Sequence, residues 1–105
     1  MPGTPALTEA TYYILLSLHR PCHGYGIMQQ TEELSGGRVR LAAGTLYGAL
    51  NSLCDKGWIV LEAADGDSRR KEYRLTDKGR EILVREVKRL KELARNGEMI
   101  LGEEL

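Results

Sequence analysis

The run Arg69-Arg70-Lys71 is the densest group of positive charge in this sequence, and cations grouped in this way bind phosphate oxygens. It lies in the stretch WIVLEAADGDSRRKEYRLT, in which two runs rich in β-branched and aromatic residues flank the polar tip Asp65-Gly66-Asp67-Ser68. That pattern is typical of a β-hairpin. The chemistry it indicates is docking onto an anionic backbone. The alternative interpretation is an ordinary hairpin tip in solvent.

His19, Cys22 and His23 are the other group whose residue types could do chemistry, here metal binding. Three ligands without an obvious fourth Cys or His make a weak site, so we expect a turn after the first helix, with no metal and no cofactor. Cys22 and Cys54 lie far apart and form no CxxC pair, which predicts reduced thiols without an intramolecular disulfide. A thiol redox sensor at Cys22 remains an alternative.

Motifs of catalysis are missing from the sequence, and its charges are unevenly distributed. There is no G-x-S-x-G, Walker glycine loop, HExxH or paired His/Asp/Ser set, so we do not expect an enzyme. Fifteen Lys and Arg balance fifteen Asp and Glu, but residues 1–68 carry four cations against seven acids and residues 69–105 carry eleven against eight. A local basic patch decides where a phosphate backbone docks.

Hydrophobic residues make up 42% of the chain and charged residues 29%, which is typical of one globular domain with at most an appended element. No stretch approaches the roughly 18 apolar residues that a membrane span needs, and the first residues lack the charged start of a signal peptide. We therefore expect a soluble cytoplasmic protein without a membrane partner.

The stretch AAGTLYGALNSL predicts an amphipathic helix over about residues 43–56. Its leucines, Leu46, Leu50 and Leu53, follow each other at spacings of four and three, so they share the face that turns to the core. A helical wheel puts Ala43 and Cys54 on the same side. The opposite face carries small and polar residues: Gly44, Gly48, Asn51 and Asp55, flanked by Thr45, Tyr47 and Ser52.

Two glycines one turn apart cost a helix about 1 kcal/mol each relative to Ala, so their presence calls for a reason. We interpret them as room for the helix to enter a DNA groove while the hydroxyls of Thr45 and Tyr47 reach phosphate oxygens. Asn51 has the amide geometry that pairs with adenine. No Arg or Lys points outward from the middle of this helix, so we expect recognition of the DNA sequence to depend on the hairpin and on DNA shape. The alternative is that Gly44 merely starts the helix and Gly48 permits tight packing against a neighbour.

The remaining elements follow from caps and breakers. Thr8 caps a helix over about residues 8–19 that Arg20-Pro21 ends, and a second helix opens at HGYG and stops at Ser35-Gly36-Gly37. A short extended strand is expected over residues 38–41. Gly57 ends the third helix, the hairpin follows, and Thr76 caps a last helix from Asp77 to about Arg95 that Asn96-Gly97 interrupts.

This order is mainly α (α+β), a winged helix-turn-helix with an added C-terminal helix. We divide the chain into a DNA-binding domain, residues 1–76, and a dimerisation helix and tail, residues 77–105. The last helix carries a coiled-coil-like stripe of Leu83, Val87, Leu90 and Ala94, which predicts pairing with a second copy whose first helix supplies Leu7, Ala10 and Ile14. The alternative is that this helix folds back on its own domain.

In such a dimer the helix predicted over about residues 43–56 is the recognition helix of each copy. A change in the angle between the paired last helices changes the separation of these two recognition helices. A ligand could act there only through different affinities for the two arrangements. The candidate residues of such an effector site are Tyr13, Leu83, Val87 and Leu90.

In this order the segments LTEATYYILLSL, HGYGI, AGTLYGALNSL with KGWI, and RRKEYRLTDKG resemble the PadR family of bacterial winged-helix transcriptional regulators, in particular its small subfamily with one C-terminal helix. The resemblance implies a homodimeric repressor that binds a palindromic double-stranded DNA operator and releases it when an effector binds or the cell is stressed. It also places Tyr25 near the DNA backbone, and Arg70, Lys71 and Tyr73 on the wing.

Some family members stack flat aromatic drugs on a tryptophan between their dimerisation helices, but the one tryptophan here, Trp58, is expected on the first strand of the hairpin, and the last helix has no aromatic residue. Multidrug stacking is therefore in doubt. A winged-helix module that binds proteins and not DNA remains the alternative function, and zero net charge is the observation in its favour.

Overall fold

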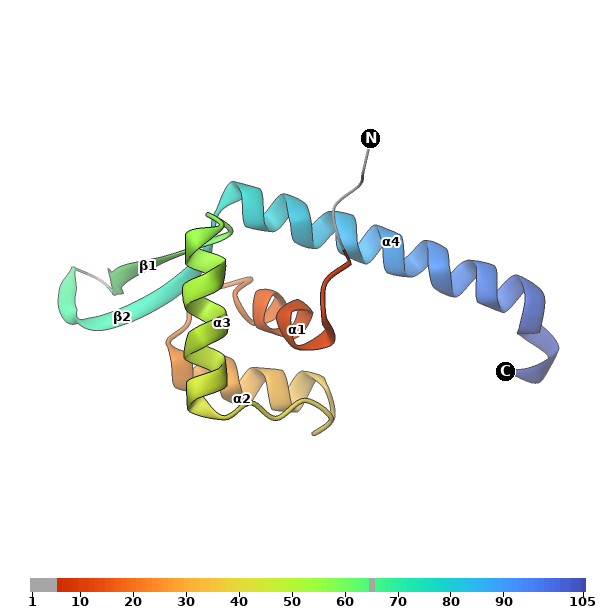
Figure 1. The fold of residues 1–105 in the computed structure, drawn as a ribbon, viewed down its shortest axis with the longest axis horizontal. Coiled ribbons are helices and arrows are strands. Elements are labelled where there is room, and N and C mark those ends of the chain that lie inside the picture. Colours follow the sequence, from red (N-terminus) through yellow and green to blue (C-terminus); the bar gives the residue numbers. More distant parts are fainter. Residues whose placement is uncertain (1–5, 65) are drawn as a thin grey trace.

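The computed structural model describes residues 6–64 and 66–105, and these form a winged helix with a long C-terminal helix (Figure 1). The elements in chain order are α1 (Glu9–Ser17), α2 (Gly24–Leu34), α3 (Ala43–Asp55), β1 (Ile59–Ala64), β2 (Asp67–Leu75), α4 (Asp77–Leu101) and a final 3-10 turn (Gly102–Glu104). The fold class predicted from the sequence is confirmed.

Helix starts lie where capping residues predict them. The Thr8 hydroxyl accepts a hydrogen bond from the Thr11 N–H at 3.1 Å, and the Thr76 hydroxyl accepts one from the Gly79 N–H at 3.1 Å. Each cap satisfies an N–H that the first turn of its helix leaves unpaired. α1 is shorter than predicted, since it ends at Ser17 before Arg20-Pro21.

One hydrophobic core joins the three short helices, the hairpin and the start of α4. Its buried members are Ile14, Leu15, Leu18, Ile27, Leu46, Leu50, Leu53, Ile59, Tyr73, Leu75 and Leu83. Ile14 is only 1% exposed, so its assignment to a dimer interface is wrong. The sequence pattern of α1 does not distinguish a residue that faces the core of its own chain from one that faces a partner.

The strand predicted at residues 38–41 does not form. These residues are irregular, and the segment that extends the hairpin is instead the turn before α2. There the Cys22 N–H donates to the Tyr73 carbonyl at 3.0 Å, and the Tyr73 N–H donates to the Cys22 carbonyl at 2.8 Å. This pairing fixes the start of α2 beside β2.

The first turn of α4 rests on the backbone at the start of the hairpin. A Cβ on Gly79 would lie 1.9 Å from the Trp58 carbonyl oxygen, so no larger residue fits there without movement. Buried α4 residues end at Glu86, and beyond it the helix projects past the core (Figure 1). The molecule is correspondingly long, with extents of 54 × 34 × 22 Å.

The predicted interruption of the last helix at Asn96-Gly97 is wrong, because α4 continues to Leu101. The sequence EMIL beyond it therefore belongs to the helix and not to a tail. A glycine inside a helix costs only about 1 kcal/mol, which does not end a helix that has formed over five turns. Among the described helices, none has the length and apolar character to cross a bilayer.

Candidate nucleic-acid interface

α3 buries its leucines and exposes the face opposite them, as predicted. Leu46 and Leu50 are fully buried and Leu53 is 3% exposed, whereas Gly44, Thr45, Gly48 and Asn51 face solvent. The wheel is wrong for Ala43, which is exposed because it begins the helix beyond the edge of the core. Cys54 is half-buried at the other end.

The two glycines of α3 have open space in front of them. Apart from the adjoining residues and the backbone of α3 itself, no atom of the described chain lies within 4 Å of a Cβ built at Gly44 or at Gly48. Gly48 is therefore not needed for packing against another part of the described chain, and that alternative is wrong. Gly44 is the second residue of α3, so the alternative that it merely starts the helix stays open, whereas for Gly48 a surface that approaches α3 from outside would give the glycine a role.

Tyr47 leans from α3 onto the start of α2. A Cβ at Gly24 would lie 2.4 Å from the Tyr47 phenol oxygen, so Gly24 leaves the space that the ring occupies. Tyr47 is 45% exposed and Tyr25, in the next position on α2, is 57% exposed. The Tyr47 phenol thus lies at the N-terminus of α2, and a helix N-terminus attracts anions. The sequence reading missed Gly24, although a glycine inside the first turn of a helix is a signal.

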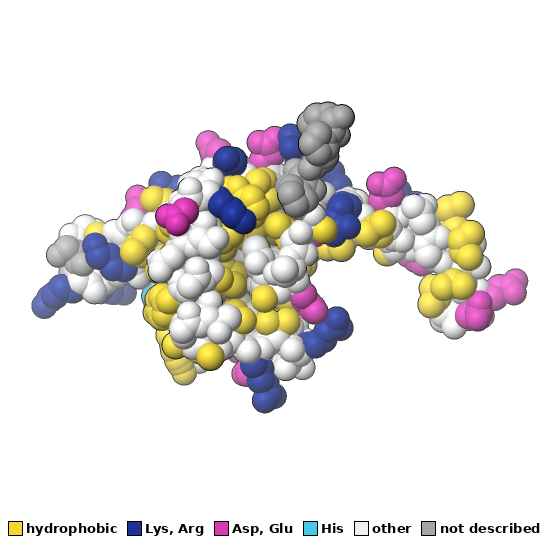
Figure 2. All heavy atoms as spheres, viewed as in Figure 1, with side chains coloured by type: hydrophobic (Ala, Val, Ile, Leu, Met, Phe, Trp, Pro, Cys, Tyr) yellow, Lys and Arg dark blue, Asp and Glu magenta, His cyan; other side chains and the backbone are white. Residues whose placement is uncertain are grey.

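Basic side chains collect at the hairpin. Arg69, Arg70 and Lys71 are exposed on β2, and Figure 2 shows Lys and Arg side chains gathered at the hairpin end of the molecule. A shallow hollow lined by His23, Ala64 and residues 69–72 joins this basic surface to the start of α2. The wing and the start of α2 therefore adjoin, and α3 reaches the start of α2 through Tyr47.

Tyr73 does not belong to that surface. It is 7% exposed and packs in the core, and burial is the main cause that raises the pKa of its phenol. Its prediction as a DNA contact is therefore wrong for the side chain. In an antiparallel hairpin alternate residues face opposite sides, and Tyr73 lies on the inward side while its neighbours Glu72 and Arg74 do not.

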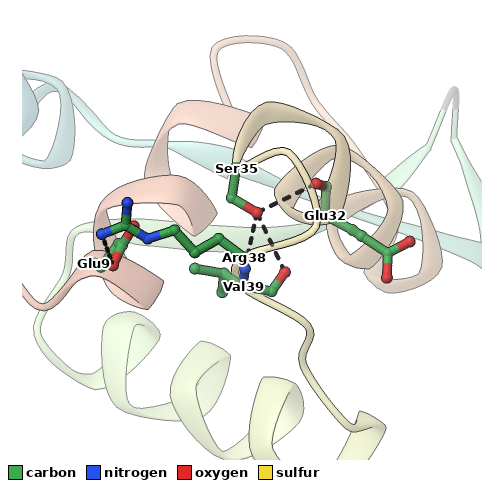
Figure 3. Close-up of polar contacts among 5 residues, drawn as sticks. All are labelled: Glu9, Glu32, Ser35, Arg38 and Val39. Carbon is green, nitrogen blue, oxygen red and sulfur yellow. Dashed lines mark hydrogen bonds and ion pairs between the residues drawn. The ribbon is translucent and has the colours of Figure 1, made fainter.

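The loop before α3 is held by polar contacts that the sequence reading did not single out (Figure 3). The Ser35 hydroxyl accepts from the Val39 N–H at 2.9 Å and donates to the Glu32 carbonyl at 3.2 Å. Arg38 forms a two-pronged ion pair with Glu9 of α1, with distances of 3.0 and 3.2 Å. Arg40 lies 3.2 Å from the Glu32 carboxylate. These contacts set where α3 begins.

Burial is the first cause that raises the pKa of both the Cys22 and the Cys54 thiols, so their reactive thiolate forms are scarcer than in solution. The Cys22 sulfur also accepts a hydrogen bond from the Gln30 amide at 3.4 Å. Within the described residues there is no group of three or more His, Cys, Asp or Glu side chains that could hold a metal ion.

The predicted dimer residues divide into two sets along α4. Leu83 is 7% exposed in the core, whereas Leu90 is 37% exposed and Ala94 is exposed. Apolar side chains continue exposed to the end of the helix, with Leu93 at 52% and Ile100 at 81%. Figure 2 shows this hydrophobic surface at the far end of the molecule. Leu7, Ala10, Tyr13 and Val87 are half-buried.

The predicted effector residues do not line the groove that lies nearest the start of α1. That groove, of about 390 Å³, lies between the segment before α1 and the end of α3. Its lining includes Leu7, Thr11, Ala49, Leu53 and Trp58, and none of Tyr13, Leu83, Val87 or Leu90. Tyr13 instead contacts Tyr12 edge to face, with ring centroids 5.6 Å apart.

Comparison with known proteins gives a family and a fold. The profile of the transcriptional regulator PadR-like family matches residues 14–85. Among solved structures, a PadR family transcription regulator from Clostridium difficile is 28% identical with a TM-score of 0.66, over 91% of this chain and 97% of that one. A PadR-like transcription factor from Bacteroides fragilis is 28% identical with a TM-score of 0.67, over 87% of each chain.

A more distant neighbour shares the fold alone. BpsR of Bordetella bronchiseptica, whose DNA binding is regulated by 6-hydroxynicotinic acid, is 18% identical with a TM-score of 0.69, over 86% of this chain and 60% of that one. No protein of curated function matches this sequence.

Proposed function

Because the chain belongs to the transcriptional regulator PadR-like family, we propose that it is a homodimeric repressor that binds a palindromic DNA operator and releases it when an effector binds. The observation that carries the proposal is the exposed face of α3, where two glycines leave open space in front of the helix, in a chain whose hairpin exposes Arg69, Arg70 and Lys71. Such a face suits a helix that enters the major groove, where a Cβ at either glycine would add bulk.

Each part of the surface has a role in this proposal. α3 presents Thr45 to phosphate and Asn51 to a base edge, with Gly44 and Gly48 against the groove. Tyr25 and Tyr47 contact the DNA backbone beside the start of α2. The first turn of that helix supplies unpaired N–H groups. Arg69, Arg70 and Lys71 follow a phosphate strand or enter the minor groove. Tyr73 contributes by packing beneath the wing.

The dimer is proposed from the part of α4 that its own domain leaves exposed. We assign DNA binding to residues 1–76 and dimerisation to residues 77–105, with Leu90 and Ala94 on the contact stripe and Leu7 and Ala10 beside it. A pair of α4 helices would hold two recognition helices about 34 Å apart, which fits two successive major grooves. The exposed apolar side chains of Leu93, Met99, Ile100 and Leu101 favour a partner over solvent.

The proposed release by an effector has a parallel in a solved structure of the same fold. BpsR shows only that a protein with this fold has DNA binding that a small molecule regulates. An effector between the α4 helices would contact Tyr13, Val87 and Leu90, with Leu83 beneath them. We propose no cofactor, no catalysis and a cytoplasmic place of action.

Substitutions in the basic hairpin distinguish this function from that of a winged-helix module that binds proteins and not DNA. We would measure binding to a labelled duplex from upstream of the protein's own gene for the wild type, for Arg70→Ala with Lys71→Ala, and for Lys88→Ala on the exposed side of α4 as control. The double variant should lose affinity and about 3.6 from the salt slope of the dimer, about 0.9 for each of the four phosphates that its two subunits no longer neutralise. Unchanged affinity in the double variant would favour the protein-binding module.

A further inference from the structure

Glu86 is the one charged side chain that is buried among those the structure describes, at 5% exposed. Taking a carboxylate out of water costs several kcal/mol, and an apolar residue of the same size in its place is often no less stable. Its burial therefore calls for a reason other than stability. The contacts of the carboxylate indicate what that reason is.

The Glu86 carboxylate joins α4 to the segment that leads into α1. The backbone N–H of Leu7 donates to Oε2 at 3.1 Å. Arg89, one turn further along α4, donates from Nε to Oε1 at 2.7 Å and from Nη2 to Oε2 at 2.9 Å. Leu7 precedes the cap of α1, so its N–H has no helical partner. The carboxylate thus holds the start of α1 and is itself oriented by Arg89.

Glu86 is also the last buried residue of α4. Gly79, Ile82 and Leu83 are the other buried ones, and every residue from Val87 to Leu101 is half-buried or exposed. Those fifteen residues extend about 22 Å at 1.5 Å per residue. A tilt of about 10° at Glu86 would therefore displace the end of α4 by about 4 Å relative to its own domain, which is close to the rise of one base pair.

We propose that Glu86 is a positioning residue for DNA binding: by holding the Leu7 N–H with Arg89, it fixes the angle at which α4 leaves the domain. The inference rests on the proposed function, because the angle matters only when two α4 helices pair. In the dimer this angle sets the separation of the two recognition helices. Glu86 therefore determines which spacing of operator half-sites the protein accepts.

A second set of contacts connects the segment at Leu7 with the loop before α3, the recognition helix. Glu9, two residues after Leu7, holds Arg38 in the loop before α3 (Figure 3). The segment that Glu86 clamps is thus in contact with both α4 and the loop that starts α3. This pair is exposed, with Arg38 at 74%, so we assign the positioning role to the buried clamp and not to it.

The test compares two duplexes, one with the half-site spacing that the wild-type dimer selects from random DNA and one with a base pair inserted between the half-sites. The variants are Glu86→Gln and, as control on the same helix, Glu81→Gln, whose partner is Arg85 in an exposed ion pair. Hydrogen exchange of the Leu7 amide reports directly whether the clamp is broken.

For the wild type and for Glu81→Gln the insertion should weaken binding about tenfold or more. For Glu86→Gln the Leu7 amide should exchange faster and the penalty for insertion should fall to about threefold or less. If Glu86→Gln does not fold, Arg89→Lys keeps the charge and loses the planar fork, and it should give an intermediate penalty.

A broken clamp with an unchanged insertion penalty would overturn the inference while the proposed function stands, and so would Arg89→Lys with the wild-type penalty. Wild-type binding that is insensitive to the insertion would instead contradict the paired dimer of the proposed function. These two failures are distinguished by the wild-type measurement alone.

Discussion

Replacing Gly48 with Ala should make the protein more stable and a weaker DNA binder. At most surface positions an added methyl group changes neither the stability of a protein nor its affinity for DNA by much. Here the site is in the middle of α3, with nothing within 4 Å of the added Cβ, so no strain opposes the change. The fold gains what a helix gains when Ala replaces Gly, while the proposed fit of α3 in the groove loses its clearance.

The expected gain in the free energy of unfolding is about 0.8–1.0 kcal/mol, from helix propensity alone. For a domain of this size that corresponds to a rise in Tm of about 4–6 °C. The expected loss in DNA binding is about 1–3 kcal/mol, the cost of forcing a methyl group into a close-packed contact. At about 1.4 kcal/mol for each tenfold, affinity should fall between about 5-fold and 150-fold.

The assay is a melting curve at fixed protein concentration together with anisotropy of a labelled operator duplex. Asn96→Ala is the matched control, because Asn96 is exposed on α4, away from the α3 face. It should also raise Tm, by helix propensity, and leave DNA affinity unchanged. A Gly48→Ala protein with higher Tm and wild-type affinity would refute the reasoning, since the glycine would then have no role in contact with DNA.

Four further predictions follow from other contacts. Gly79→Ala should destabilise the fold by about 1–3 kcal/mol or more, seen as a lower urea midpoint, because its Cβ would lie 1.9 Å from the Trp58 carbonyl oxygen; a wild-type midpoint would contradict this. Gly24→Ala should displace the Tyr47 ring and weaken DNA binding as much as Tyr47→Ala does, measured by anisotropy. Leu90→Asp should shift the protein from dimer to monomer in light scattering at about 10 µM, a concentration within the usual range of such contacts, whereas Lys88→Ala should not. Hydrogen bonds from Arg89 lower the pKa of the Glu86 carboxyl, so its contribution to stability is present above the unfolded value of about 4.3 and is lost as pH falls through the lower folded value; urea midpoints should drop less on acidification for Glu86→Gln than for the wild type.

The recognition helix could be read from the sequence because its pattern is local. The leucine spacing of AAGTLYGALNSL fixed the buried face of α3, and the caps at Thr8 and Thr76 fixed two helix starts. These features depend on residues within one turn of each other. The exposed face with Gly44 and Gly48 follows from the same periodicity, so the exposure of this face is confirmed, while its contact with DNA stays a prediction.

The errors concern contacts between distant segments. Residues 38–41 have a strand-like composition, but Cys22 is the partner that pairs with Tyr73, and no local rule selects between them. Ile14 was assigned to a partner copy and Tyr73 to DNA because a periodic pattern gives the side of an element and not what covers that side. Glu86 was overlooked because a charged residue on a helix is usually exposed, and its burial depends on the Leu7 N–H on another segment.

The central claim is that this surface selects a DNA sequence. The most direct measurement is binding of the purified protein to the duplex from upstream of its own gene, titrated across salt against a scrambled duplex of equal length. The account predicts tighter binding to the native duplex at every salt concentration, with affinity falling linearly in log–log form as salt rises. Equal affinity for the two duplexes, or no binding at low salt, would contradict it.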